Sequence, residues 1–112
     1  MKKTTLLLIR HGQTDWNLAG KFQGHTDIPL NQHGMMQAQK VAHVIHTKNM
    51  PLAAIYSSDL QRAHQTAQPI STLFSLEIIL TPDLREGNLG LLEGLTKQER
   101  DDKYGALDIE NL

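Results

Sequence analysis

The side chains with the clearest chemical potential stand near the start of the chain, where Arg10, His11 and Gly12 directly follow an apolar run. A neutral imidazole is a good nucleophile near neutral pH, because its ordinary pKa is about 6.5. A guanidinium stays charged and binds phosphate through paired hydrogen bonds. Gly12 lets the backbone turn closely enough to hold the imidazole. These residue types in this order favour nucleophilic attack on phosphorus.

Two later segments supply the other groups that such a reaction needs. Arg62 stands shortly after Ser57 and Ser58, and Arg85 precedes Glu86. Phosphoryl transfer depends mainly on positioning and on positive charge near the equatorial oxygens. A carboxylic acid must also protonate the leaving oxygen and later activate water, and Glu86 is the candidate. Burial or a neighbouring phosphate should then raise the pKa of Glu86.

The hydrophobic pattern predicts alternating strands and helices. Residues 4–9 form a continuous apolar run of the kind found in a strand buried on both faces, and residues 53–56 and 76–80 predict a second and a third strand. Asn31 is a good cap for the helix between the first two strands. The apolar stripe of that helix consists of Ala38, Val41, Ala42 and Ile45.

A second helix is expected after the second strand. Ser58 and Gln61 have the spacing of a capping box, and Pro69 should kink or split the helix because it removes an amide. Its apolar face consists of Leu60, Ala63, Ala67, Ile70 and Phe74. Residues 18–30 and 83–94 are expected to form loops.

Another capping box, from Thr96 to Glu99, predicts a short helix that runs to about Tyr104. The order β-α-β-α-β-loop-α is typical of an α/β layer fold with right-handed crossovers. Ligands in such sheets bind beyond the carboxyl ends of the strands. His11, Arg62 and Glu86 each follow a different predicted strand, so we expect them to meet at one rim.

Composition limits the alternatives. The chain has 112 residues, enough for a single domain, and a formal net charge of −1 that gives no reason to expect nucleic acid as a partner. There is no cysteine, and the apolar run before Arg10 is too short for a signal peptide or a membrane span. We therefore expect a cytoplasmic protein that associates with neither nucleic acid nor membranes.

The sequence resembles the histidine phosphatase superfamily, which contains cofactor-dependent phosphoglycerate mutases and many small phosphatases. The resemblance extends from residue 5 to about residue 104. It rests on the segments 9–12, 16–17, 22–30, 34–38, 57–67 and 84–94, which include Arg10-His11-Gly12, Ser57-Ser58-Asp59-Leu60-Gln61-Arg62 and Leu84-Arg85-Glu86. It implies a three-layer α/β/α fold with a mostly parallel sheet.

The resemblance also implies roles for single residues. His11 would be the phosphorylated nucleophile and Glu86 the proton donor. The expected phosphate-binding and substrate-binding residues are Arg10, Gly12, Asn17, Gln23, Gly24 and Arg62. The expected ligand is a small phosphorylated metabolite, and no metal, nucleotide or other cofactor is implied. His43 and His46 are spaced i, i+3 as metal ligands can be, but a solvated helix face is the expected interpretation.

The family's second active-site histidine has no counterpart, since no histidine follows His64. Residues 1–112 therefore resemble a single, partial family domain, truncated after about three strands. In the family the first strand is central, so its flank would here be an exposed apolar edge. We expect a homo-oligomer that forms through this edge.

Three activities fit the motifs: a phosphomonoesterase, a phosphoglycerate mutase-type isomerase, and a truncated chain that is weakly active or inactive. Gln23 stands where mutases of the family have Ser or Thr, and segment 85–90 differs from the mutase pattern. Both differences favour the phosphatase. Loss of one phosphoryl-binding group should cost about 3–4 kcal/mol of transition-state stabilisation, which supports the third alternative.

Overall fold

The computed structural model describes residues 5–85 and 93–99. Along the chain its elements are α1 (Asp15–Ala19), α2 (Gln32–Thr47), β1 (Ile55–Ser58), α3 (Gln61–Phe74), β2 (Ile78–Thr81) and the 3₁₀ turn η1 (Pro82–Leu84). None of the helices in these two ranges is long and apolar enough to cross a membrane.

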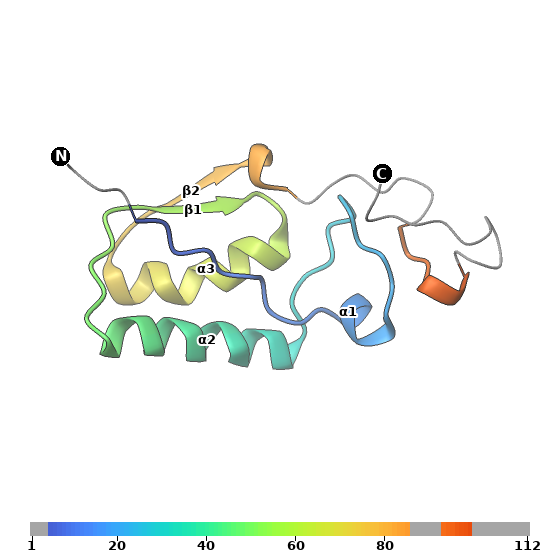
Figure 1. Cartoon of the computed structure of the whole chain (residues 1–112), viewed down its shortest axis with the longest axis horizontal. Helices are drawn as coiled ribbons and strands as arrows, with labels where there is room; N and C mark the ends of the chain where they lie inside the picture. Colours follow the sequence, from blue (N-terminus) through green and yellow to red (C-terminus); the bar gives the residue numbers. More distant parts are fainter. Residues whose placement is uncertain (1–4, 86–92, 100–112) are drawn as a thin grey trace.

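The sheet consists of β1 and β2, which are parallel. Ile55 pairs with Ile78 at one end, and Ser58 pairs with Thr81 at the other. Parallel neighbours need a crossover, and α3 provides it. Figure 1 shows α3 between the sheet and α2. The expected α/β class with a parallel sheet is confirmed, and within the described ranges α3 covers one face of the sheet while α2 packs on α3.

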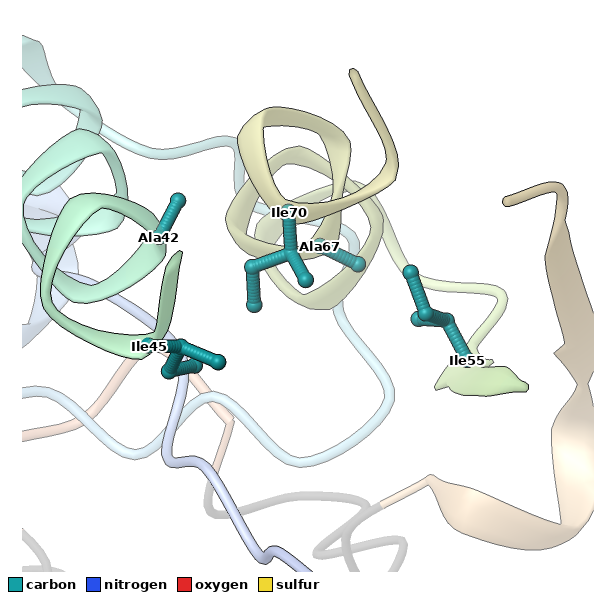
Figure 2. Packing of buried hydrophobic residues seen from close by; sticks show 5 residues of the cluster. All are labelled: Ala42, Ile45, Ile55, Ala67 and Ile70. Atoms are coloured by element: carbon teal, nitrogen blue, oxygen red, sulfur yellow. The ribbon is translucent and has the colours of Figure 1, made fainter. Parts of the chain in front are cut away.

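The hydrophobic core lies where α2, α3 and β1 meet. Figure 2 shows Ala42 and Ile45 of α2 facing α3, Ala67 and Ile70 within α3, and Ile55 on β1. Each of these residues is at most 8% exposed. The three isoleucines each contribute about 1.5–3 kcal/mol on burial, and the two alanines let the backbones of α2 and α3 approach closely. This small core fixes the helix that carries Arg62.

Helix α2 forms as the sequence predicts. The side chain of Asn31 caps it by accepting a hydrogen bond from the Gly34 amide at 2.8 Å. Ala38, Ala42 and Ile45 of the predicted stripe are buried. At the end of α2, the ring of His46 meets the ring of Phe74 edge-on, with centroids 5.6 Å apart.

Helix α3 corrects the prediction about its cap and shows that Pro69 does not split it. Its N-cap is Leu60, which makes no side-chain capping bond, so the predicted capping box at Ser58 is wrong. The Gln61 amide instead donates to the carboxylate of Asp27 at 2.7 Å. Pro69 lies inside α3 without splitting it, because burial of the flanking Ala67 and Ile70 outweighs one lost backbone hydrogen bond.

The predicted first strand is also corrected. Residues 5–10 have no regular secondary structure, and Figure 1 draws them as a trace without an arrow. A strand exists only through hydrogen bonds to a neighbour, and the described residues offer this segment none. Leu6 and Leu8 are 79% and 89% exposed as a result. The second and third strands exist, but each begins two residues later than predicted.

Two local structures complete the fold. Helix α1 was not expected from the sequence, and it begins at a reciprocal capping box between Thr14 and Asn17. The predicted capping box at Thr96 and Glu99 is confirmed, since each backbone amide donates to the other residue's side chain at 3.1 Å. The rest of that predicted helix, up to Tyr104, and most of loop 83–94 lie outside the described residues.

Candidate active site

His11 lies directly after segment 5–10, and a hydrogen bond to the neighbouring backbone orients its ring. Its Nδ1 is 2.7 Å from the carbonyl oxygen of Gly12. A carbonyl only accepts, so Nδ1 carries a proton in this contact, which in a neutral imidazole is the single ring proton. The lone pair is then on Nε2. This is the tautomer that a nucleophilic histidine requires if Nε2 is to attack.

Thr66 joins the His11–Gly12 turn to helix α3. The Gly12 amide donates to the hydroxyl of Thr66 at 3.0 Å, and that hydroxyl donates to the carbonyl of Arg62 at 2.7 Å. The nucleophile candidate is thus tied to the turn of α3 that carries the phosphate-binding candidate. Thr66 was not among the expected site residues, although its place in segment 57–67 was a signal for it.

Arg62 is 1% exposed and holds the segment that precedes Asp27. Its Nη1 donates to the carbonyl of Thr26 at 2.7 Å, and its Nη2 donates to the carbonyl of Gly24 at 2.6 Å. These carbonyl dipoles compensate a charge that would otherwise be costly to bury. A guanidinium has five N–H groups, so these two bonds are compatible with binding of a phosphoryl oxygen as well.

Asn17 and Gln23 meet at the buried hydroxyl of Thr14. That hydroxyl is 2.7 Å from Oε1 of Gln23, and the Thr14 amide donates to Oδ1 of Asn17 at 3.0 Å. Gln23 is itself only 6% exposed. The two side chains therefore belong to the framework under the site. The amide nitrogen of Asn17 remains the atom suited to donate to an anion.

Two backbone contacts set how closely α2 approaches the site. A Cβ on Gly12 would be 2.5 Å from the carbonyl oxygen of Gly34, and a Cβ on Gly34 would be 2.1 Å from the carbonyl oxygen of Gln13. Neither distance is possible for a real side chain. Glycine at both positions lets the first turn of α2 rest directly on the residues that follow His11.

Arg85 pairs with Asp59 at the carboxyl ends of β1 and β2. Its Nε and Nη2 each donate to a different carboxylate oxygen at 2.6 Å. The hydrogen bond from Arg85 lowers the pKa of Asp59, and the same contact raises the pKa of Arg85. Arg85 thus fixes the end of η1 against the turn before α3. Glu86, the expected proton donor, lies outside the described residues.

The structure joins the His11–Gly12 turn to Arg62 through Thr66, and Arg62 binds the carbonyl of Gly24. Gln23 instead bonds the hydroxyl of Thr14. Arg10 is exposed on the segment before the turn. Within residues 5–85 and 93–99, no group of three or more side chains could hold a metal ion. His43 is exposed on α2, in keeping with a solvated helix face.

The chain combines a parallel α/β fold with an Arg10-His11-Gly12 turn, and Thr66 joins this turn to Arg62 on the crossover helix α3. This combination points to one family of proteins. The family model of the histidine phosphatase superfamily (branch 1) matches residues 6–109. The chain belongs to this superfamily.

Similar proteins include phosphatases and mutases. The chain is 44% identical over 101 residues to a metal-independent phosphoserine phosphatase of Arabidopsis thaliana, covering 89% of this chain and 42% of that protein. It is 39% identical over 109 residues to a 2,3-bisphosphoglycerate-dependent phosphoglycerate mutase of Bartonella henselae, covering 95% and 53%. A solved mycobacterial glucosyl-3-phosphoglycerate phosphatase in complex with VO3 matches with a TM-score of 0.78 and 41% identity, covering 86% and 46%. The chain spans about half the length of these relatives.

Proposed function

We propose that this chain hydrolyses a small phosphomonoester through a phosphohistidine intermediate on His11. The single observation that carries the proposal is the hydrogen bond from Nδ1 of His11 to the Gly12 carbonyl, which places the lone pair on Nε2. Relatives named for phosphoserine, phosphoglycerate and glucosyl-3-phosphoglycerate support the substrate class.

In the proposed reaction, Nε2 of His11 forms a bond to phosphorus while the bond from phosphorus to the ester oxygen breaks. Glu86 gives its proton to the departing alkoxide, so that the first product leaves as an alcohol. Water, deprotonated by the Glu86 carboxylate, then attacks the phosphohistidine and releases phosphate and free His11. The carbonyl of Gly12 holds Nδ1–H through both steps, which keeps Nε2 as the reacting atom.

Arg10 and Arg62 are proposed to stabilise the charge on the equatorial oxygens, with Asn17 donating a further hydrogen bond. The buried position of Arg62 strengthens such an interaction, because little water screens the guanidinium. Gly12, Gln23 and Gly24 are proposed to shape the space in which the phosphoryl group binds.

The test is hydrolysis of an aryl phosphate by the purified chain beside His11→Ala. We expect His11→Ala to abolish hydrolysis, and His43→Ala, an exposed histidine on α2, to leave it unchanged. Trapping of phosphate on the wild-type chain after alkaline quenching, where a phosphohistidine is stable, and its absence from His11→Ala would identify the intermediate. Equal hydrolysis by wild type and His11→Ala would refute the proposal.

Two other outcomes would point to the alternatives. Isomerisation of phosphoglycerate without net hydrolysis would support a mutase, the activity for which the Bartonella relative is named. No turnover of either substrate would support a partial domain without activity of its own.

Assembly is part of the proposal. We propose that residues 1–112 form a single partial domain, cytoplasmic in location, that associates with a second copy through the exposed apolar side of segment 5–10 and the sheet. Leu8 is 89% exposed there, and Tyr56 of β1 is 64% exposed. Isolated sheet edges of this kind favour pairing with another chain.

A further inference from the structure

Hydrogen bonds to residues of α3 and to Glu93 fix the segment from Gln23 to Asp27. Arg62 binds the carbonyls of Gly24 and Thr26, and the Asp27 carboxylate accepts from the Gln61 amide. These bonds fix the segment to α3 from one side. We call residues 23–27 the anchored loop.

On another side, the anchored loop is held by Glu93. The hydroxyl of Thr26 donates to Oε1 of Glu93 in a short hydrogen bond. A Cβ on Gly24 would lie 2.7 Å from Oε2 of Glu93, and Gly24 has a φ of +54°. Only glycine suits this position, because the backbone is left-handed and the carboxyl group lies against its Cα. Glu93 therefore contacts both residues whose carbonyls bind Arg62.

The backbone around Glu93 keeps it in place. The Gly94 amide donates to the Phe22 carbonyl at 2.7 Å, and the Phe22 amide donates to the Leu95 carbonyl at 2.7 Å. These bonds join Gly94 and Leu95, the two residues that follow Glu93, to the residue before the anchored loop. The carboxyl group is thus presented by a hydrogen-bonded backbone.

We infer that Glu93 is a positioning residue for Arg62, acting through the hydroxyl of Thr26. The inference rests on the proposed role of Arg62 in binding a phosphoryl group. Glu93 holds Thr26 and Gly24, and the carbonyls of these two residues orient the guanidinium of Arg62. Displacing a catalytic group by about 1 Å can cost a hundredfold in rate, so a support of this kind matters for function.

The test compares Glu93→Gln and Thr26→Val with the conservative variant Thr26→Ser. Glu77→Gln, an exposed glutamate before β2, is the matched control. The probe is inorganic phosphate, and its affinity is measured by calorimetric titration. Thermal unfolding of each variant and amide exchange at Thr26 and Ile28 are measured beside it.

We expect Thr26→Val, which removes the hydrogen bond to Glu93, and Glu93→Gln, which removes the charge of its acceptor, each to weaken phosphate binding about tenfold. Amide exchange in the anchored loop should accelerate in both variants while the unfolding midpoint changes little. Thr26→Ser keeps the hydroxyl and should bind phosphate as the wild type does, and Glu77→Gln should too.

Two results would overturn the inference in different ways. If the wild type binds phosphate and both Thr26→Val and Glu93→Gln bind it equally well, Glu93 does not position Arg62 and the proposed function stands. If the wild type itself does not bind phosphate, the proposed function fails, and the inference fails with it.

Discussion

Arg62 shows why one side chain can have a structural role and a chemical role at once. Its guanidinium is buried and donates to two backbone carbonyls. Arg62→Ala would remove a phosphate-binding group and also the guanidinium donors to both carbonyls, of which that of Thr26 still accepts from the Ile28 amide. Loss of the bond to the buried Gly24 carbonyl alone would cost about 1–3 kcal/mol. A loss of activity in that variant would therefore not distinguish catalysis from folding. Changes at Thr26 and Glu93 leave the buried charge in place.

The ion pair between Asp59 and Arg85 should make stability depend on pH in acid. Arg85 lowers the pKa of Asp59 in the folded chain below its ordinary 3.8. The pair therefore stabilises the fold above about pH 3.8, and this contribution disappears as the pH falls through the lowered pKa. Arg85, whose pKa is raised, stays charged over the whole range.

We expect Asp59→Asn to lower the thermal midpoint at pH 6, and the difference from wild type to shrink as the pH falls below about 3.8. The effect should be modest, because the two side chains are 31% and 32% exposed and water screens the pair. Thermal melts between pH 2.5 and 7 measure it. A difference that grows toward low pH would contradict the assignment.

At the scale of elements, the site depends on how closely α2 packs against the residues after His11. The Gly34 Cα lies against the backbone of Gln13, and the Gln13 amide also donates to the side chain of Gln37 at 2.8 Å. Helix α2 therefore supports the turn that carries the imidazole.

Gly34→Ala should separate α2 from that turn. Alanine normally stabilises a helix relative to glycine by about 1 kcal/mol. Here its Cβ would meet the Gln13 carbonyl at 2.1 Å, and we expect a net loss of about 1–3 kcal/mol in unfolding free energy. Urea unfolding measures it, with Gln39→Ala at an exposed position of the same helix as the control. A gain in stability for Gly34→Ala would show that the two backbones are not in contact.

The elements that the sequence predicted well are those whose stability is local. The Asn31 cap and the apolar stripe of α2 are recognisable from neighbouring residues in the sequence. The same is true of the reciprocal cap between Thr96 and Glu99. The cap of α3 was not predictable locally, because its acceptor, Asp27, is distant in sequence. Segment 5–10 has the composition of a buried strand, yet a strand also needs a neighbour.

In the candidate site, too, some residues were predictable from the sequence and others only from the fold. The types and spacing of His11, Gly12 and Arg62 were sufficient to predict that they belong together, and Thr66 joins them in the structure. Glu93 lies in segment 84–94 of the resemblance, but its contact to Thr26 spans 67 residues and has no local pattern, so this contact could not be predicted from the sequence. Pairings between distant residues are known only once the fold is known.

At the scale of the whole molecule, one side of the sheet region is unusually apolar for a surface. Leu6, Leu8 and Tyr56 are between 64% and 89% exposed, and Ile79, which pairs with Tyr56, is 45% exposed. Large exposed apolar side chains, such as the paired Tyr56 and Ile79, mark sites of association when they form a patch. Segment 5–10 adds backbone groups that a neighbouring strand could pair.

We therefore expect self-association to depend on this apolar side. Sedimentation velocity over a wide concentration range should show dimers for the wild type and monomers for Leu8→Glu. Folding should hardly change, because substitution at so exposed a position alters stability by about 0.5 kcal/mol at most. Leu18→Glu makes the same chemical change at a residue that is 71% exposed on α1, and it should leave the dimer intact. A wild type that stays monomeric at every concentration would refute the proposed assembly. If Leu18→Glu dissociated the dimer as completely as Leu8→Glu does, the association would come from general surface hydrophobicity, and the sheet region would have no special part in it.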